Sequence, residues 1–161
     1  PATSSEGSET SGLSLSPPFA LSIAISSTDI IACSTASGHI WVGYGGSRGL
    51  PASQGKRKSR KWDGLKTEFG LWIQAGNGPI VGVAFLPQNE RMLVSLSLGG
   101  ELTCFEIPDV WSPRAEATKQ WNVPAKRIVK ATTIVAENNC VLICGVSSKA
   151  RGIMELLTLP A

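Results

Sequence analysis

The feature that most restricts the fold of this chain is a sequence unit that occurs three times. Each unit contains an apolar run, a short polar turn, a second apolar run, a Gly-containing turn and a third apolar run. The units are FALSIAISSTDIIACSTASGHIWVGY (19–44), PIVGVAFLPQNERMLVSLSLGGELTCFEI (79–107) and IVKATTIVAENNCVLICGVSSKARGIMELLTL (128–159). Repetition at this spacing indicates an array of similar supersecondary units that stack on one another.

The first two units keep a common register along their length. Ile31-Ala32-Cys33 and Leu93-Val94-Ser95 are 62 residues apart, and the same interval separates Gly38-His39-Ile40 from Gly100-Glu101-Leu102. Without an insertion of roughly 18 residues within 45–64, the period is about 44 residues, which matches the ~40–45 residues of a four-stranded propeller blade.

The apolar runs have the composition of β-strands. They are short, rich in Ile, Val, Leu and Thr, and bounded by Gly, Asn, Ser and Pro. A fourth strand is expected at Leu65–Gln74 in the first unit and at Lys119–Val123 in the second, with none in the third. One short helix is expected from Ser112, a capping residue followed by Pro113, to Lys119. The prediction is an all-β fold, a β-propeller segment of about three four-stranded antiparallel blades.

The units define the expected domain organisation. Residues 1–18 are Ser-rich and contain little to bury, which predicts a flexible lead-in. Residues 19–161 form the propeller segment, with blades at about 19–74, 79–123 and 128–161 and the basic insertion at about 45–64. Closed propellers often complete the last blade with a strand from the other end of the chain. A last blade of three strands therefore predicts a C-terminal fragment of a larger ring, or a chain that needs a partner to close the ring.

The closest matches to a known pattern are GPIVGVAFLPQNERMLVSLSLGGELTCFEI and IIACSTASGHIWVGY. These segments resemble the strand-turn-strand core of WD-repeat (WD40-like) β-propellers, and the resemblance extends over residues 19–159. The repeats are degenerate, because the third strands end in WVGY, CFEI and ELLTL instead of Trp-Asp, and Ser37 and Gly99 replace the usual Asp. The resemblance implies a non-catalytic protein–protein interaction scaffold, a complex subunit with other proteins as partners.

A strongly basic segment interrupts the first unit. Outside residues 45–66 the chain has 8 basic and 11 acidic residues, so its positive net charge comes from this segment. The candidate site is its core, made of Lys56, Arg57, Lys58, Arg60, Lys61 and Trp62. Such a run fits a solvated loop, a nuclear import signal, or a contact with nucleic acid or anionic lipid, where Trp62 could stack on a base. The alternative function is therefore a nuclear nucleic-acid- or chromatin-associated factor that binds through residues 56–61.

Motifs for catalysis, cofactors or membrane insertion are missing from the sequence. His39, the sole histidine, lies in no nucleophile-elbow context, and the glycines of GYGGSRG lack a Walker-type Gly-Lys-Ser/Thr ending. Acidic residues are scattered singly, and no apolar stretch approaches the roughly 20 residues that span a bilayer. The expectation is a protein without enzymatic activity, cofactor or membrane span, located inside the cell in the nucleus or cytoplasm.

Cysteines and tryptophans are assigned to packing. The four cysteines form no CxxC pair and are expected to be buried, reduced thiols and not metal ligands; they are Cys33, Cys104, Cys140 and Cys144. Trp41 and Trp72 fall within predicted strands and are expected to anchor the packing between blades.

Overall fold

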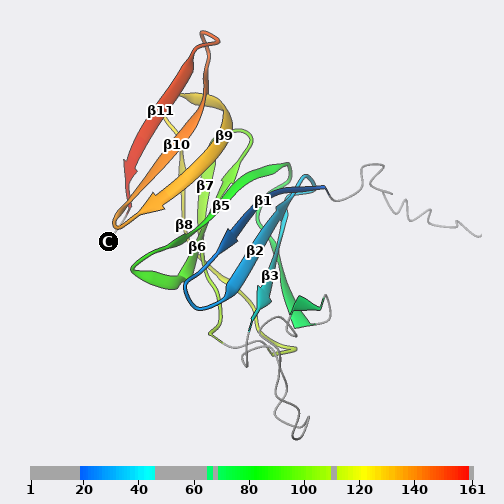
Figure 1. Ribbon diagram of the computed structural model, residues 1–161. Helices are drawn as coiled ribbons and strands as arrows, with labels where there is room; N and C mark the ends of the chain where they lie inside the picture. The colour runs from blue at the N-terminus through cyan, green and yellow to red at the C-terminus, as the bar shows by residue number, and fades with distance from the viewer. Residues whose placement is uncertain (1–18, 46–64, 67–68, 110–111, 160–161) are drawn as a thin grey trace, which may run out of the picture.

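The computed structural model describes residues 19–45, 65–66, 69–109 and 112–159 (Figure 1). Eleven β-strands form the regular structure of these residues, and no α-helix occurs among them. The strands are β1 (Ala20–Ile25), β2 (Ile30–Thr35), β3 (His39–Tyr44), β4 (Gly70–Gln74), β5 (Ile80–Leu86), β6 (Asn89–Ser97), β7 (Glu101–Glu106), β8 (Thr118–Pro124), β9 (Ile128–Glu137), β10 (Cys140–Ser147) and β11 (Gly152–Thr158). The all-β prediction is confirmed.

The strands form three antiparallel meanders, one for each sequence unit. The first sheet has the order β1-β2-β3-β4, the second β5-β6-β7-β8 and the third, within the described residues, β9-β10-β11. The predicted fourth strands of the first two units are present as β4 and β8. Strands β1, β5 and β9 are neighbours in space, so the first strands of the three sheets lie side by side (Figure 1).

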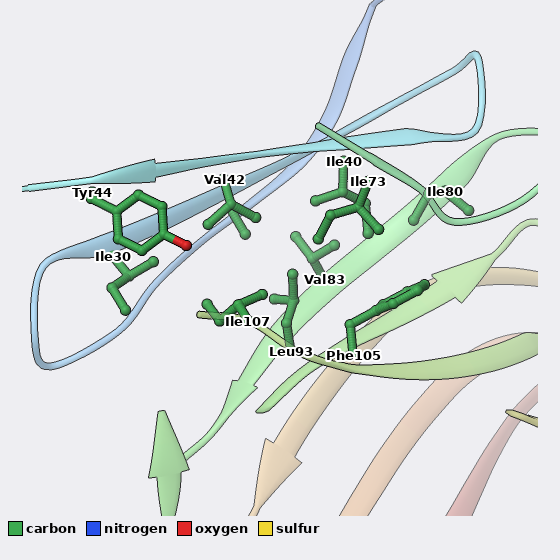
Figure 2. Packing of buried hydrophobic residues seen from close by; sticks show 11 residues of the cluster. Ile30, Ile40, Val42, Tyr44, Ile73, Ile80, Val83, Leu93, Phe105 and Ile107 are labelled. Atoms are coloured by element: carbon green, nitrogen blue, oxygen red, sulfur yellow. The ribbon is translucent and has the colours of Figure 1, made fainter. Parts of the chain in front are cut away.

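Apolar side chains fill the space between the first and second sheets (Figure 2). The strands alternate, so that Ile40, Val42 and Tyr44 on β3 point to the same side and meet Leu93 and Phe105 of the second sheet. The complete cluster is Ile30, Ala32, Ile40, Val42, Tyr44, Ile73, Ile80, Val83, Leu93, Phe105 and Ile107. Each large side chain buried in this way contributes about 1.5–3 kcal/mol to folding.

The second sheet is covered on both faces. Its other face carries Val94, Leu96, Leu102 and Cys104, which pack against the third sheet through a second cluster. The third sheet contributes Ile128, Ala131, Ile134, Val141 and Ile143. Because both faces of β6 are covered, residues Leu93–Leu96 are buried without interruption, which explains why apolar residues do not alternate with exposed polar ones here.

The turn between the second and third strands has the same geometry in all three sheets. The amides of Gly38, Gly100 and Ala150 donate to the carbonyls three residues earlier, and all three residues have positive φ, at 86°, 85° and 55°. A Cβ at Gly38 would overlap the carbonyl oxygen of Gly76, so glycine is needed there for space as well as for conformation. In the third unit Ala150, and not the conspicuous Gly152, takes this position.

The predicted helix at Ser112–Lys119 is wrong. A single turn, in which the amide of Ala115 donates to the carbonyl of Ser112, occupies the cap and proline positions. The chain then extends into β8, where Thr118 already pairs with Glu106 of β7. Ladder hydrogen bonds and the partial burial of Trp121 therefore outweigh the local capping signal.

The packing roles assigned to cysteines and tryptophans are correct only in part. Cys104 is fully buried, and burial raises its pKa to about 12, but Cys33, Cys140 and Cys144 are partly exposed. Trp41 and Trp72 are cross-strand partners on the face of the first sheet that points away from the second sheet. They do not lie between any two of the three described sheets, because sequence alternation alone does not say which face of a sheet is covered.

Tyr44 provides a test of the first core cluster. Its side chain is fully buried and its hydroxyl donates to the carbonyl oxygen of Pro108 at 3.0 Å. Burial, together with the nearby charge of Asp109, raises the pKa of Tyr44 to about 12. The neutral phenol therefore contributes stability that is fully present below the unfolded pKa of about 10 and is lost as pH rises through the folded value.

We expect the free energy of unfolding to fall by about 2–3 kcal/mol across this alkaline window through Tyr44 alone. Denaturant unfolding at a series of pH values measures it, and phenolate absorbance reports Tyr44 specifically because it is the only tyrosine. The control is Tyr44→Phe, which should lose this part of the pH dependence. An equally steep decline in the Phe variant would contradict the assignment.

Candidate interaction surfaces

The face of the first sheet that points away from the second sheet is an apolar surface, here called the first outer face. Its residues are aligned by register, with Ile25 beside Ile31, Ile23 beside Cys33, and Cys33 beside Trp41. Ile23 and Ile25 are 64% and 61% exposed, and Trp72 at the end of the row is 50% exposed. Large apolar side chains gathered in this way on one face are typical of an interaction surface.

The third sheet has a corresponding second outer face. Leu142 lies between Val135 and Leu156, and Cys144 lies between Thr133 and Met154. Met154 and Leu156 are 69% and 66% exposed. Val141 and Ile143, which alternate with these residues on β10, are fully buried against the second sheet.

When the three sequence units are aligned, the residues of the outer faces correspond to residues that are buried between sheets. Ile31 and Cys33 align with Leu93 and Ser95 of the second sheet, and both of these are buried. When the common turn geometry is used for alignment, Cys144 corresponds to Ala32 and Val94, which are also buried. The outer faces are therefore sheet-packing positions that no described sheet covers.

A second kind of surface lies at one edge of the sheets, here called the turn edge. It is formed by the turns that follow the second strands and by the connections between consecutive sheets. The amides of Ala75 and Gly76 donate to the carbonyl of Gly38, and the amide of Ala125 donates to the carbonyl of Gly100. These hydrogen bonds tie each connection to the turn of the preceding sheet.

Two hollows open on the turn edge. The first, of about 510 Å³, is lined by Gly76, Asn77, Gly78, Pro79, Ser97, Leu98, Gly99, Glu101, Val129 and Lys130. The second, of about 540 Å³, is lined by Lys126, Arg127, Val129, Ser147, Ser148, Lys149, Arg151, Gly152 and Ile153. Four cations and no carboxylate are among the described residues that line the second hollow, so its described lining is strongly basic.

Glu155 of β11 fixes the connection that carries two of these cations. Its carboxylate oxygens accept hydrogen bonds from the backbone amides of Lys126 at 2.9 Å and Arg127 at 3.1 Å. The opposite wall is the turn after β10, where the carbonyl oxygen of Arg151 accepts from the amide and the hydroxyl of Ser147. Both walls of the hollow are therefore anchored by backbone hydrogen bonds.

The predicted basic site and the observed basic hollow consist of different residues. Lys56, Arg57, Lys58, Arg60, Lys61 and Trp62 all lie outside the described residues. The hollow was not predicted because its cations are spread over residues 126–151 and only the sheet brings them together. The sequence did contain two local clusters of cations that could have indicated the hollow: Lys126-Arg127 directly before a predicted strand, and Lys149 and Arg151 around a predicted turn.

Among the described residues, the side chains suited to catalysis do not form a catalytic arrangement. Ser37 Oγ lies 3.2 Å from His39 Nδ1, but Ser37 Oγ also bonds Thr35, and Thr35 Oγ1 bonds both the amide and the carbonyl of His39. This network stabilises the turn after β2, and no described carboxylate orients the imidazole. The described residues also hold no group of three or more His, Cys, Asp or Glu that could bind a metal ion.

Within the described chain, no helix has the length and apolar character that crossing a membrane would require.

Comparison with known proteins identifies the fold. No protein-family model matches the chain, and no curated protein matches it. Sqt1 from Chaetomium thermophilum is similar in structure, with a TM-score of 0.51 and 11% identity over 89% of this chain and 37% of that one. The β-propeller domain of Cps50 (Swd1) from Myceliophteria thermophila gives a TM-score of 0.45 and 10% identity over 89% of this chain and 44% of that one.

Both proteins are WD40 β-propellers. The likeness to Sqt1, together with the three stacked antiparallel meanders, shows that this chain has the fold of a β-propeller segment. The chain spans less than half the length of either of these structures.

The role of Glu155 can be tested by Glu155→Gln. We expect faster amide hydrogen exchange at Lys126 and Arg127, because a neutral amide oxygen is a weaker acceptor than a carboxylate and only one such oxygen remains. Hydrogen exchange followed by NMR or mass spectrometry measures the change. Glu137→Gln is the matched control, an exposed carboxylate at the opposite end of β9. Unchanged exchange at both amides in the Glu155 variant would show that Glu155 does not anchor this connection.

Proposed function

We propose that this chain is a non-catalytic protein-interaction scaffold of the WD-repeat type, and a subunit of complexes with other proteins. One observation carries this proposal: exposed apolar residues gather on both outer faces, at positions that the internal interfaces of the same molecule bury. Surfaces of this kind gain free energy when another apolar face covers them, at about 25 cal/mol per Å². The propeller fold supports the proposal by analogy, since its rigid sheets hold turns and connections in place for binding.

The proposed occupants of the outer faces are propeller sheets supplied by partner chains. The two internal interfaces support this proposal because they are alike. In each of them, one face of a sheet packs against the opposite face of the next sheet along the chain. The first outer face and the second outer face continue that series in its two directions. The described chain covers only 37% of Sqt1, which leaves room for such sheets in an assembly of comparable size.

This proposal predicts that the 161-residue chain associates with itself as its concentration rises, because its outer faces are uncovered. Replacing Met154 and Leu156 by Lys should shift the association to higher concentration, since burying these charges is costly. Light scattering over a concentration series measures the mass. The matched control is Val129→Lys, which removes an exposed apolar side chain outside both outer faces. A chain that stays monomeric throughout would overturn the proposal that these faces are interfaces.

A second candidate function, nuclear binding of nucleic acid or chromatin, rests on the run of five cations in six positions from Lys56 to Lys61. We expect binding to a DNA duplex to weaken steeply with salt, because the cations displace counterions from the phosphates. Replacing the five cations by Ser should abolish the binding, which fluorescence anisotropy measures. Binding that survives the replacement would assign the affinity to another surface, and altered localisation with unchanged affinity would identify an import signal instead.

A further inference from the structure

The basic hollow at the turn edge is a surface separate from the two outer faces. Lys126 and Arg127 lie on the connection between the second and third sheets, and Lys149 and Arg151 lie at the turn after β10. All four residues are exposed, and none of them forms an ion pair with another described residue. Four unpaired cations around one concave surface repel one another, so an anion that enters between them is attracted to all four.

The hollow is held in a defined shape before any partner arrives. Glu155 fixes the backbone of Lys126 and Arg127, and the Ser147–Arg151 hydrogen bonds fix the opposite wall. The Glu155 carboxylate is occupied by these two amides, and its single negative charge leaves an excess of three positive charges. Binding of a partner therefore costs little conformational entropy in the backbone of this site, which favours binding.

We propose that the basic hollow binds an acidic, extended segment of a partner protein. The charge selects carboxylate side chains, and the remaining lining supplies places for a peptide. Val129 and Ile153 provide apolar contact, while Ser147, Ser148 and Gly152 are small enough for a backbone to approach. The described residues that line the hollow include no aromatic side chain, so they offer no stacking platform of the kind that holds single-stranded nucleic acids. This inference rests on the proposed function as a protein scaffold and names one of its binding sites.

The test measures the affinity of the full 161-residue chain for a fluorescent peptide rich in Asp and Glu with a single Leu. All proteins carry Ser in place of the five cations of residues 56–61, so that this segment cannot contribute. Lys149→Ser combined with Arg151→Ser should weaken binding about tenfold or more, because two charge-assisted contacts are lost. The matched control combines Arg114→Ser and Lys119→Ser, which lower the net charge equally outside the hollow.

A result in which both double variants lose affinity equally would overturn the inference, because the attraction would then be general. An oligothymidine that displaces the peptide and depends on Lys149 and Arg151 would also overturn it, in favour of nucleic acid. If no peptide binds but the chain still associates through its outer faces, this inference fails while the proposed scaffold stands. If the peptide binds and the chain stays monomeric, the inference that the hollow binds acidic segments is supported, whereas the proposed role of the outer faces fails.

Discussion

The structure depends on the packing of one sheet face against the opposite face of the next. Each unit is a meander that cannot bury its apolar residues alone, and among the described sheets only the second has both faces covered by described residues. This requirement explains why Leu93–Leu96 are continuously buried while Ile23 and Leu156, on the two end sheets, are exposed. It also makes stability a property of neighbouring sheets, as in other repeat architectures, which supports the proposal that the outer faces are interfaces.

The turn geometry determines which residues lie together at the turn edge. A residue with positive φ recurs at Gly38, Gly100 and Ala150, and in the first two sheets the carbonyl of that glycine accepts a hydrogen bond from the connection that follows. The connections and turns therefore gather along one edge of all three sheets. Sheet pairing and these hydrogen bonds thus bring together side chains that are far apart in the sequence, including Lys126 and Lys149.

Periodicity predicted the strands and the order of strands in each sheet, because these follow from local alternation and repeat length. It did not predict which faces are covered. The predictions that Trp41 and Trp72 anchor packing between blades and that Cys33 is buried therefore fail, because all three lie on the first outer face. The helix expected at Ser112 does not form, because the segment pairs with β7 instead. Capping residues do not reveal such a long-range interaction. The basic hollow depends on such long-range proximity too, whereas the run at Lys56–Lys61 is visible in sequence only because its charges are contiguous.

The two kinds of surface can act at the same time because they share no residue. The second outer face uses Leu142, Met154 and Leu156, whereas the hollow uses Gly152 and Ile153 from the same strand β11. Ile153 also packs toward the second sheet, on the side opposite Met154. A sheet that covers the second outer face would thus bury Met154 and Leu156 without using the cations at the turn edge. Completing the ring and binding an acidic segment are therefore compatible, and closure would stabilise β11, the strand whose Glu155 holds one wall of the hollow.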